Sequence, residues 1–107
     1  MAKEAKLPYN EFKNILKLMK DFSTKNNSQL YFVYLPNYDR YKKNSHNNEL
    51  LKIKKTVYQL QLPFIDINEE VFKKEKNPLK LFPFEKNNHY TVEGYKKIAL
   101  KIYEKTR

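Results

Sequence analysis

The feature that most constrains the fold is an unbroken apolar run over residues 30–35, which read Leu-Tyr-Phe-Val-Tyr-Leu. Pro36 closes this run. A strand with one face in water alternates between apolar and polar residues, whereas a strand that is covered on both faces is apolar throughout. The run therefore predicts a strand of a parallel sheet, with other parts of the protein lying on both of its faces.

Amphipathic helices are predicted on both sides of this strand. Pro8 suits a first helical turn, and the apolar residues that follow it recur at three- and four-residue steps up to the polar residues 26–28. These apolar residues are Phe12, Ile15, Leu16, Met19 and Phe22. A second amphipathic helix is predicted over residues 50–60, and residues 63–67 form the second strand candidate. The order strand, helix, strand predicts a βαβ unit with a right-handed connection.

A closing amphipathic helix is predicted after Thr91, a residue type that caps helix N-termini. Its apolar face carries Val92, Tyr95, Ile98, Ala99, Ile102 and Tyr103. Before this helix, residues 68–76 suggest a short helix, while the proline-interrupted residues 78–84 allow no assignment. The predicted fold class is therefore α/β, with parallel strands and flanking helices.

The two predicted strands are too few to form a stable sheet by themselves. A length of 107 residues suits one small domain, and residues 1–107 show no internal repeat or linker. Two parallel strands do not form a stable open sheet alone, least of all when one is apolar on both faces. We therefore expect a single α/β domain whose sheet is completed by another chain or by residues before Met1.

The charge of the chain is strongly positive but is not arranged as in a nucleic-acid-binding protein. There are 22 Lys+Arg against 12 Asp+Glu, a formal net charge of +10. Only Arg40 and Arg107 are arginines, the residue type that phosphate and base recognition favours, and the lysines are spread over every segment. Nucleic acid is therefore not favoured as a partner, although a basic α/β module that binds nucleic acid or another polyanion stays open as the alternative.

Metal, cofactor and membrane signals are not found in the sequence. There is no cysteine for a thiolate metal site, and Asp66, Glu69 and Glu70 do not match a metal-ligand spacing. We expect no metal and no cofactor. No apolar run approaches the roughly 18 residues of a membrane span. The chain does not open with a secretory signal pattern, and the sequence does not indicate a compartment.

The segment with the most chemical information lies directly before the closing helix. His89 stands in a polar loop, where a neutral imidazole can act as a general base near neutral pH. Gly94 is the only glycine of the chain, and its position in the first helical turn predicts close packing against a neighbouring backbone.

Residues 89–95, which read His-Tyr-Thr-Val-Glu-Gly-Tyr, together with Ile98 and Ala99 resemble the last block of the SGNH (GDSL-type) hydrolases. The strand that ends at Pro36 and the strand around Asp66 are similar to strands of that family. The resemblance follows the order of elements through nearly the whole chain, although its specific part is only about ten residues long. It implies the C-terminal portion of a three-layer α/β/α domain of flavodoxin-like topology, and a hydrolase that removes an acyl or acetyl group from a carbohydrate or lipid.

The same resemblance implies roles for two residues. His89 would be the base that activates a serine for attack on an ester carbonyl. Family members carry an aspartate three residues before the histidine, but this chain has Lys86 there and Glu85 one residue earlier. Glu85 is the candidate that orients the imidazole; a backbone carbonyl, or a site that has lost its activity, are the alternatives.

The serine of this family is not found in the chain. Its members carry the serine in a Gly-Asp-Ser segment near the start of the domain, and no glycine precedes Gly94. Ser23, Ser28 and Ser45 are expected to be turn or capping residues, as are Asp39 and Asp66, and His46 is expected to be a surface residue. The chain alone is therefore expected to have no esterase activity. Its expected partners are an ester-bearing small molecule or glycan once the domain is completed, and a second chain that pairs with the open strand edge.

Overall fold

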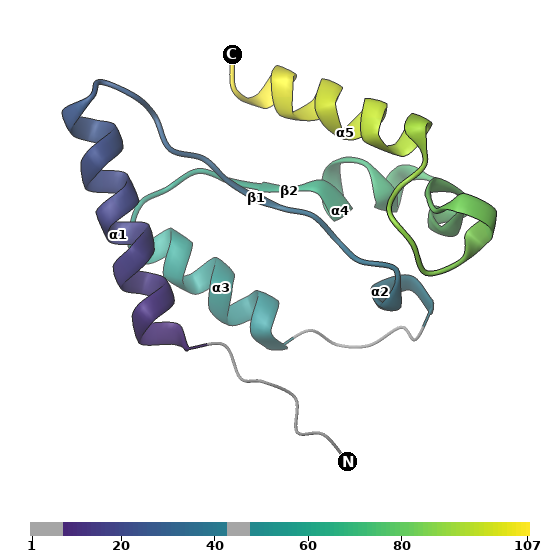
Figure 1. Cartoon of the computed structure of the whole chain (residues 1–107), viewed down its shortest axis with the longest axis horizontal. Helices are drawn as coiled ribbons and strands as arrows, with labels where there is room; N and C mark the ends of the chain where they lie inside the picture. Colours follow the sequence, from purple (N-terminus) through teal and green to yellow (C-terminus); the bar gives the residue numbers. More distant parts are fainter. Residues whose placement is uncertain (1–7, 43–47) are drawn as a thin grey trace. The chain divides into compact units, whose positions relative to one another are not determined.

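The structure, a computed structural model, describes residues 8–42 and 48–107, and it divides the chain into two compact units (Figure 1). The first unit contains described residues 8–32 and 48–63, and the second contains residues 33–42 and 64–107.

The first unit is a pair of helices, α1 (Tyr9–Lys25) and α3 (Asn48–Gln59). Leu16 of α1 is buried together with Leu50 and Val57 of α3, as the apolar periodicity predicts. The side chain of Lys20 donates a hydrogen bond of 2.6 Å to the carbonyl of Leu60, which satisfies an acceptor beyond the C-terminus of α3. The predicted apolar face of α1 is only partly buried, because Ile15, Met19 and Phe22 are exposed.

The second unit contains the sheet and the closing helix. In chain order its elements are most of β1 (Phe32–Tyr34), α2 (Asp39–Lys42), β2 (Phe64–Asp66), α4 (Ile67–Glu70), three short 3-10 helices η1 (Phe72–Lys74), η2 (Pro78–Leu81) and η3 (Pro83–Glu85), and α5 (Val92–Lys105). The core of this unit holds side chains that are at most 5% exposed: Ile65, Ile67, Val71, Phe72, Leu81, Phe82 and Ile98.

An aromatic cluster fills part of this core. Phe72 and Phe82 lie at its centre, with ring centroids 5.8 Å apart. Tyr41 stacks on Phe72 at 5.4 Å, and Tyr90 packs against both phenylalanines. Ring contacts at these distances add stability beyond that of the buried area. The rings that these contacts join among the described residues are Tyr38, Tyr41, Phe72, Phe82, Tyr90 and Tyr95.

The predicted α/β class is confirmed, and the three-layer topology is not formed by the described residues. β1 and β2 are parallel neighbours in a two-stranded sheet, and each strand has three residues. Such a sheet is too narrow to carry a layer of helices on each face. β1 is also shorter than the predicted residues 30–35, and its three residues are half-buried instead of covered on both faces.

The residues without a predicted assignment, 78–84, form η2 and the start of η3. Both of these short helices begin with a proline, whose fixed φ and missing N–H suit a first turn. Asn77 caps η2, because its Oδ1 accepts a hydrogen bond from the backbone N–H of Leu79. No helix in the described part of the chain has the length and apolar character that crossing a bilayer requires.

Candidate functional site

The loop that carries His89 lies between η3 and α5 and is fixed at its junction with the helix. Thr91 caps α5, as predicted: its Oγ1 accepts a hydrogen bond of 2.9 Å from the N–H of Gly94. The N–H of Thr91 donates a hydrogen bond of 2.8 Å to the carbonyl of Leu81 at the end of η2. The start of α5 is therefore tied to the segment that precedes the loop.

Gly94 packs closely against this junction, which confirms the predicted close approach of a backbone. A Cβ at this position would lie 3.1 Å from the carbonyl oxygen of Leu81 and 3.2 Å from the Cβ of Tyr90. Both distances are shorter than ordinary van der Waals contacts. Glycine thus permits η2, Tyr90 and the first turn of α5 to meet at one point.

His89 is exposed, and only its backbone has a hydrogen-bond partner. Its N–H donates to the Oδ1 of Asn88 at 2.8 Å. Its imidazole makes no hydrogen bond or ion pair with any residue that the structure describes. Both ring nitrogens are therefore accessible to a ligand or to another polypeptide.

Glu85 contacts a different residue from the one that the family resemblance implies. One of its carboxylate oxygens accepts a hydrogen bond of 2.6 Å from the side-chain amide of Asn77. Phe84 and Glu85 both have φ of 55°, a left-handed conformation that is uncommon for residues other than glycine. In this arrangement the carboxylate of Glu85 pairs with Asn77 and not with His89.

Tyr90 connects the loop to the segment that follows β1. Its hydroxyl donates a hydrogen bond to the carbonyl of Pro36, two residues beyond the end of β1. Figure 1 shows both strands running toward the side on which the loop and the start of α5 lie. His89 is thus carried by a loop that is bonded to the chain at the carboxyl ends of the strands, the edge where open α/β sheets place their functional groups.

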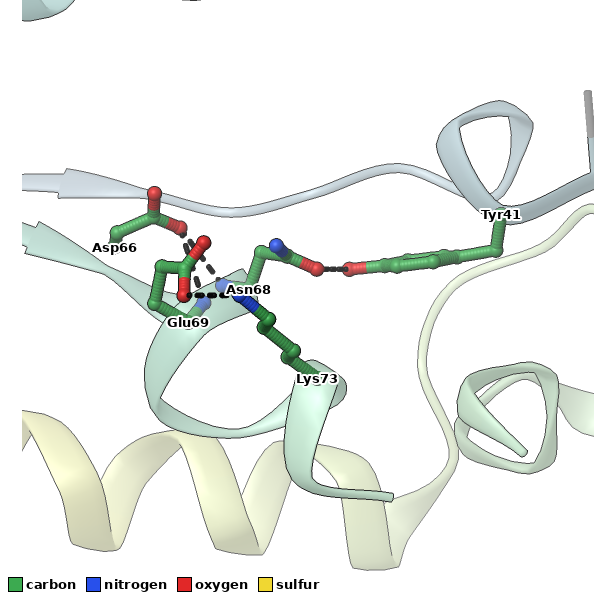
Figure 2. Close-up of polar contacts among 5 residues, drawn as sticks. All are labelled: Tyr41, Asp66, Asn68, Glu69 and Lys73. Carbon is green, nitrogen blue, oxygen red and sulfur yellow. Dashed lines mark hydrogen bonds and ion pairs between the residues drawn. The ribbon is translucent and has the colours of Figure 1, made fainter. Parts of the chain in front are cut away.

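A second polar network lies at the same ends of the strands and involves Asp66 (Figure 2). Asp66 caps α4, because its Oδ1 accepts hydrogen bonds from the N–H groups of Asn68 and Glu69. The hydroxyl of Tyr41 donates a hydrogen bond of 2.7 Å to the buried Oδ1 of Asn68. The predicted capping role of Asp66 is confirmed, and the network joins α2 to α4.

Arg40 adds a positive charge to this edge. Its Nη1 donates a hydrogen bond of 3.0 Å to the hydroxyl of Tyr34, the last residue of β1. The guanidinium carbon lies 5.6 Å from the centroid of the same ring, within the range of a cation–π contact. The backbone N–H of Arg40 donates to the Oδ1 of Asn37, which fixes the start of α2.

Burial changes the acidity of two tyrosines in the aromatic cluster. It raises the pKa of Tyr90 to about 12, and it also raises the pKa of Tyr41. In both cases the neutral phenol is favoured because a phenolate is poorly solvated among the surrounding rings. Both hydroxyls therefore stay protonated hydrogen-bond donors at neutral pH.

The raised pKa of Tyr90 predicts a loss of stability at alkaline pH. An unfolded tyrosine has a pKa near 10, so the unfolded chain releases its proton first as the pH rises. The free energy of unfolding should be unaffected below about pH 9 and should fall between about pH 10 and 12. Because a half-exposed phenol is screened by solvent, we expect Tyr90 to contribute about 1 kcal/mol to this fall.

Urea unfolding followed by circular dichroism at pH 8, 10 and 11 measures this effect. Tyr90→Phe should reduce the fall in stability above pH 10, while Tyr58→Phe, at a position that is 83% exposed, should leave it unchanged. Equal pH profiles for the two variants would contradict the prediction.

The other candidate residues have structural roles or lie outside the described residues. The hydroxyls of Ser23 and Ser28 donate to backbone carbonyls at the end of α1, in agreement with the predicted turn roles, and Asp39 is the first residue of α2. Glu69 pairs with Lys73. Ser45 and His46 lie outside the described residues. Within residues 8–42 and 48–107, no three histidine, cysteine or acidic side chains come together as a metal site.

Several lysines of α5 form ion pairs with neighbouring carboxylates. Lys97 bonds to Glu75, and this hydrogen bond raises the pKa of Lys97. Lys101 pairs with Glu104 at 3.1 Å, and Lys105 pairs with Glu70 at 3.2 Å. The positive charge of this helix is therefore partly compensated within the second unit.

The sequence reasoning missed the contacts that join distant segments. The bond between Tyr90 and Pro36 spans 54 residues, and the bond between Tyr41 and Asn68 spans 27. The sequence shows a tyrosine directly after the loop histidine, but nothing in the sequence identifies the carbonyl that accepts the hydrogen bond of its hydroxyl. Comparison of the chain with protein-family models, with curated proteins and with solved structures found no match.

Proposed function

We propose that the chain is the C-terminal part of an SGNH-type ester hydrolase domain, in which His89 is the general base. The serine nucleophile would be carried by polypeptide outside these 107 residues. The completed domain would remove an acyl or acetyl group from a carbohydrate or lipid, and the added polypeptide would extend the sheet toward the three-layer topology of that family.

The observation that carries the proposal is the place of His89. The imidazole is exposed and has no hydrogen-bond partner among the described residues, while the next residue is bonded to the segment that follows β1. A general base must reach the proton that it removes, and in this loop no described residue occupies the ring nitrogen that would accept that proton.

The reaction would follow the usual course of serine acyl transfer. The serine oxygen attacks the ester carbonyl carbon while His89 takes its proton, and the imidazolium then protonates the departing alcohol. Water attacks the acyl-enzyme with His89 as the base, which releases the carboxylic acid and restores the serine. Hydrogen-bond donors for the oxyanion would come from the added polypeptide.

Glu85 is the proposed partner that orients the imidazole. To do so its carboxylate would exchange the amide of Asn77 for a ring N–H of His89. The left-handed backbone at Phe84 and Glu85 supports a functional role, because such strain is often kept at active sites. A backbone carbonyl from the added polypeptide is the alternative partner.

Exposed apolar surface in the second unit supports the proposal of a missing polypeptide. Of the predicted apolar face of α5, Ile98 is buried, whereas Val92, Tyr95 and Tyr103 are exposed. Each strand of the two-stranded sheet has one neighbour among the described residues and therefore one edge without a ladder partner. Additional strands, or a second chain, would cover such an edge.

The test compares the chain alone with a completed domain. The purified chain should hydrolyse p-nitrophenyl acetate no faster than an equal concentration of free imidazole does, because an exposed imidazole attacks this ester weakly by itself and the chain has no serine for His89 to activate. The coding DNA upstream of Met1 should contain a Gly-Asp-Ser segment, and co-expression of that product with the chain should produce an esterase. A His89-dependent rate in the chain alone that is well above that of free imidazole, or no such segment upstream, would refute the proposal.

Polyanion binding is a second candidate that the net charge of +10 favours. Binding through lysines to phosphates would fall steeply with salt, because each neutralised phosphate releases a counterion. A gel-shift series from low to moderate salt separates the two functions. Retention of RNA or DNA at low salt only would support the second candidate, and no retention at low salt would remove it.

A further inference from the structure

We infer that Tyr90 is a positioning residue, whose hydroxyl fastens the backbone that carries His89 to the segment following β1. The inference rests on the proposed function for the role of His89. The anchor itself is a contact within the second unit.

The side chain of His89 does not hold the loop in place. The imidazole has no hydrogen-bond partner among the described residues, and the preceding residues 86–88 are exposed. The fixed points are found after the histidine: the ring and hydroxyl of Tyr90, and the N–H of Thr91, which bonds to Leu81. The position of the imidazole is therefore set from its C-terminal side.

Tyr90 is held at both ends of its side chain. Its ring lies 5.3 Å from that of Phe72 and 5.4 Å from that of Phe82, between centroids. Its hydroxyl reaches the carbonyl of Pro36, a residue that is less than 2% exposed. A buried carbonyl without a hydrogen bond is unfavourable. The hydroxyl of Tyr90 supplies the donor that the carbonyl of Pro36 needs.

The phenol of Tyr90 keeps its proton near neutral pH. Burial raises the pKa of Tyr90 to about 12, so its hydroxyl stays a hydrogen-bond donor throughout the neutral range. The anchor therefore needs no proton transfer of its own, and it would hold the loop in one place during the proposed reaction.

The variant Tyr90→Phe removes the hydroxyl and keeps the ring in the aromatic cluster. Tyr95→Phe is the matched control, because its ring lies 5.3 Å from that of Tyr90 and its hydroxyl has no partner among the described residues. Backbone ¹⁵N relaxation of the full chain is the first measurement. For Tyr90→Phe the order parameters of residues 88–90 should fall from about 0.85 toward 0.6, and for Tyr95→Phe they should not change.

The second measurement uses the completed domain and p-nitrophenyl acetate. Tyr90→Phe should lower kcat by about tenfold with KM unchanged, because a misplaced base weakens the chemical step and not substrate binding. Tyr95→Phe should change neither constant. A merely structural role for the hydroxyl would not produce this separation of kcat from KM.

The outcomes distinguish the two ideas. Unchanged order parameters in Tyr90→Phe would overturn the anchor, and an unchanged kcat in an active completed domain would overturn the positioning role while leaving the proposed function intact. If the completed wild-type domain hydrolyses no ester, the proposed function and the positioning role both fail, and the order parameters alone then decide the anchor.

Discussion

In the completed domain, His89→Ala is expected to lower kcat/KM for p-nitrophenyl acetate by about 10²–10⁴-fold. This is the usual contribution of a positioned general base. The physical reason is that a serine hydroxyl is a weak nucleophile at neutral pH and needs a neighbouring base to take its proton. Alanine leaves no proton acceptor at this position, while the Thr91 cap, the Gly94 contact and the Tyr90 anchor would all remain.

The second histidine of the chain supplies the matched control. His46→Ala should leave kcat/KM within twofold of the unchanged domain. Added imidazole should restore part of the rate to His89→Ala, because the alanine leaves space for a free base. Similar rates for His89→Ala and the unchanged domain would remove His89 from the reaction.

In the same assay Glu85→Gln should lower kcat/KM by tenfold or more, because Glu85 is the residue proposed to orient the ring of His89.

The largest expected effect on stability comes from Phe72. This side chain is fully buried and contacts the rings of Tyr41, Phe82 and Tyr90. Phe72→Ala should lower the free energy of unfolding of the second unit by about 3–5 kcal/mol, the combined cost of the lost burial and of the cavity. Urea unfolding followed by near-ultraviolet circular dichroism measures this loss through the tyrosine signals of the cluster.

Phe84 provides the same substitution at an exposed position of the same unit. Its side chain is 92% exposed, and alanine retains the Cβ that makes the left-handed backbone costly, so that cost does not change. Phe84→Ala should therefore change stability by no more than about 0.5 kcal/mol. A loss below 1 kcal/mol for Phe72→Ala, or equal losses for the two variants, would contradict the assignment of Phe72 to the core.

The contrast between these two phenylalanines also shows where the sequence was uninformative. They lie twelve positions apart in a region with weak periodicity, and neither spacing nor composition separates the buried ring from the exposed one. Burial of Phe72 depends on the turns around η1 and on ring contacts with residues as distant as Tyr41. Phe84 is exposed at a point where the backbone has left-handed φ values, at residues 84 and 85. The sequence does not indicate this conformation, because neither position is a glycine or an asparagine.

Some features of the candidate site were predictable from the sequence, and others were not. The position of His89 before a helix, the cap at Thr91 and the close packing at Gly94 are local features, and residue type and spacing predicted all three. The relation between His89 and Glu85 was not predictable, because four residues of irregular backbone do not determine where two side chains point. In the structure Glu85 bonds to Asn77 instead, and Tyr90 takes the role of fixing the loop.

By itself the sequence determined the class of the fold and the identity of its main elements. α1, α3, α5 and both strands follow from apolar periodicity, proline positions and helix caps, which act over a few residues. Only the tertiary structure decided the length and burial of the strands, the path of residues 72–91 and the bond between Tyr90 and Pro36. The physical reason is the sequence separation of the residues in contact. Hydrogen bonds between residues 27 to 54 positions apart depend on how distant segments pack together, and local sequence preferences do not determine that packing.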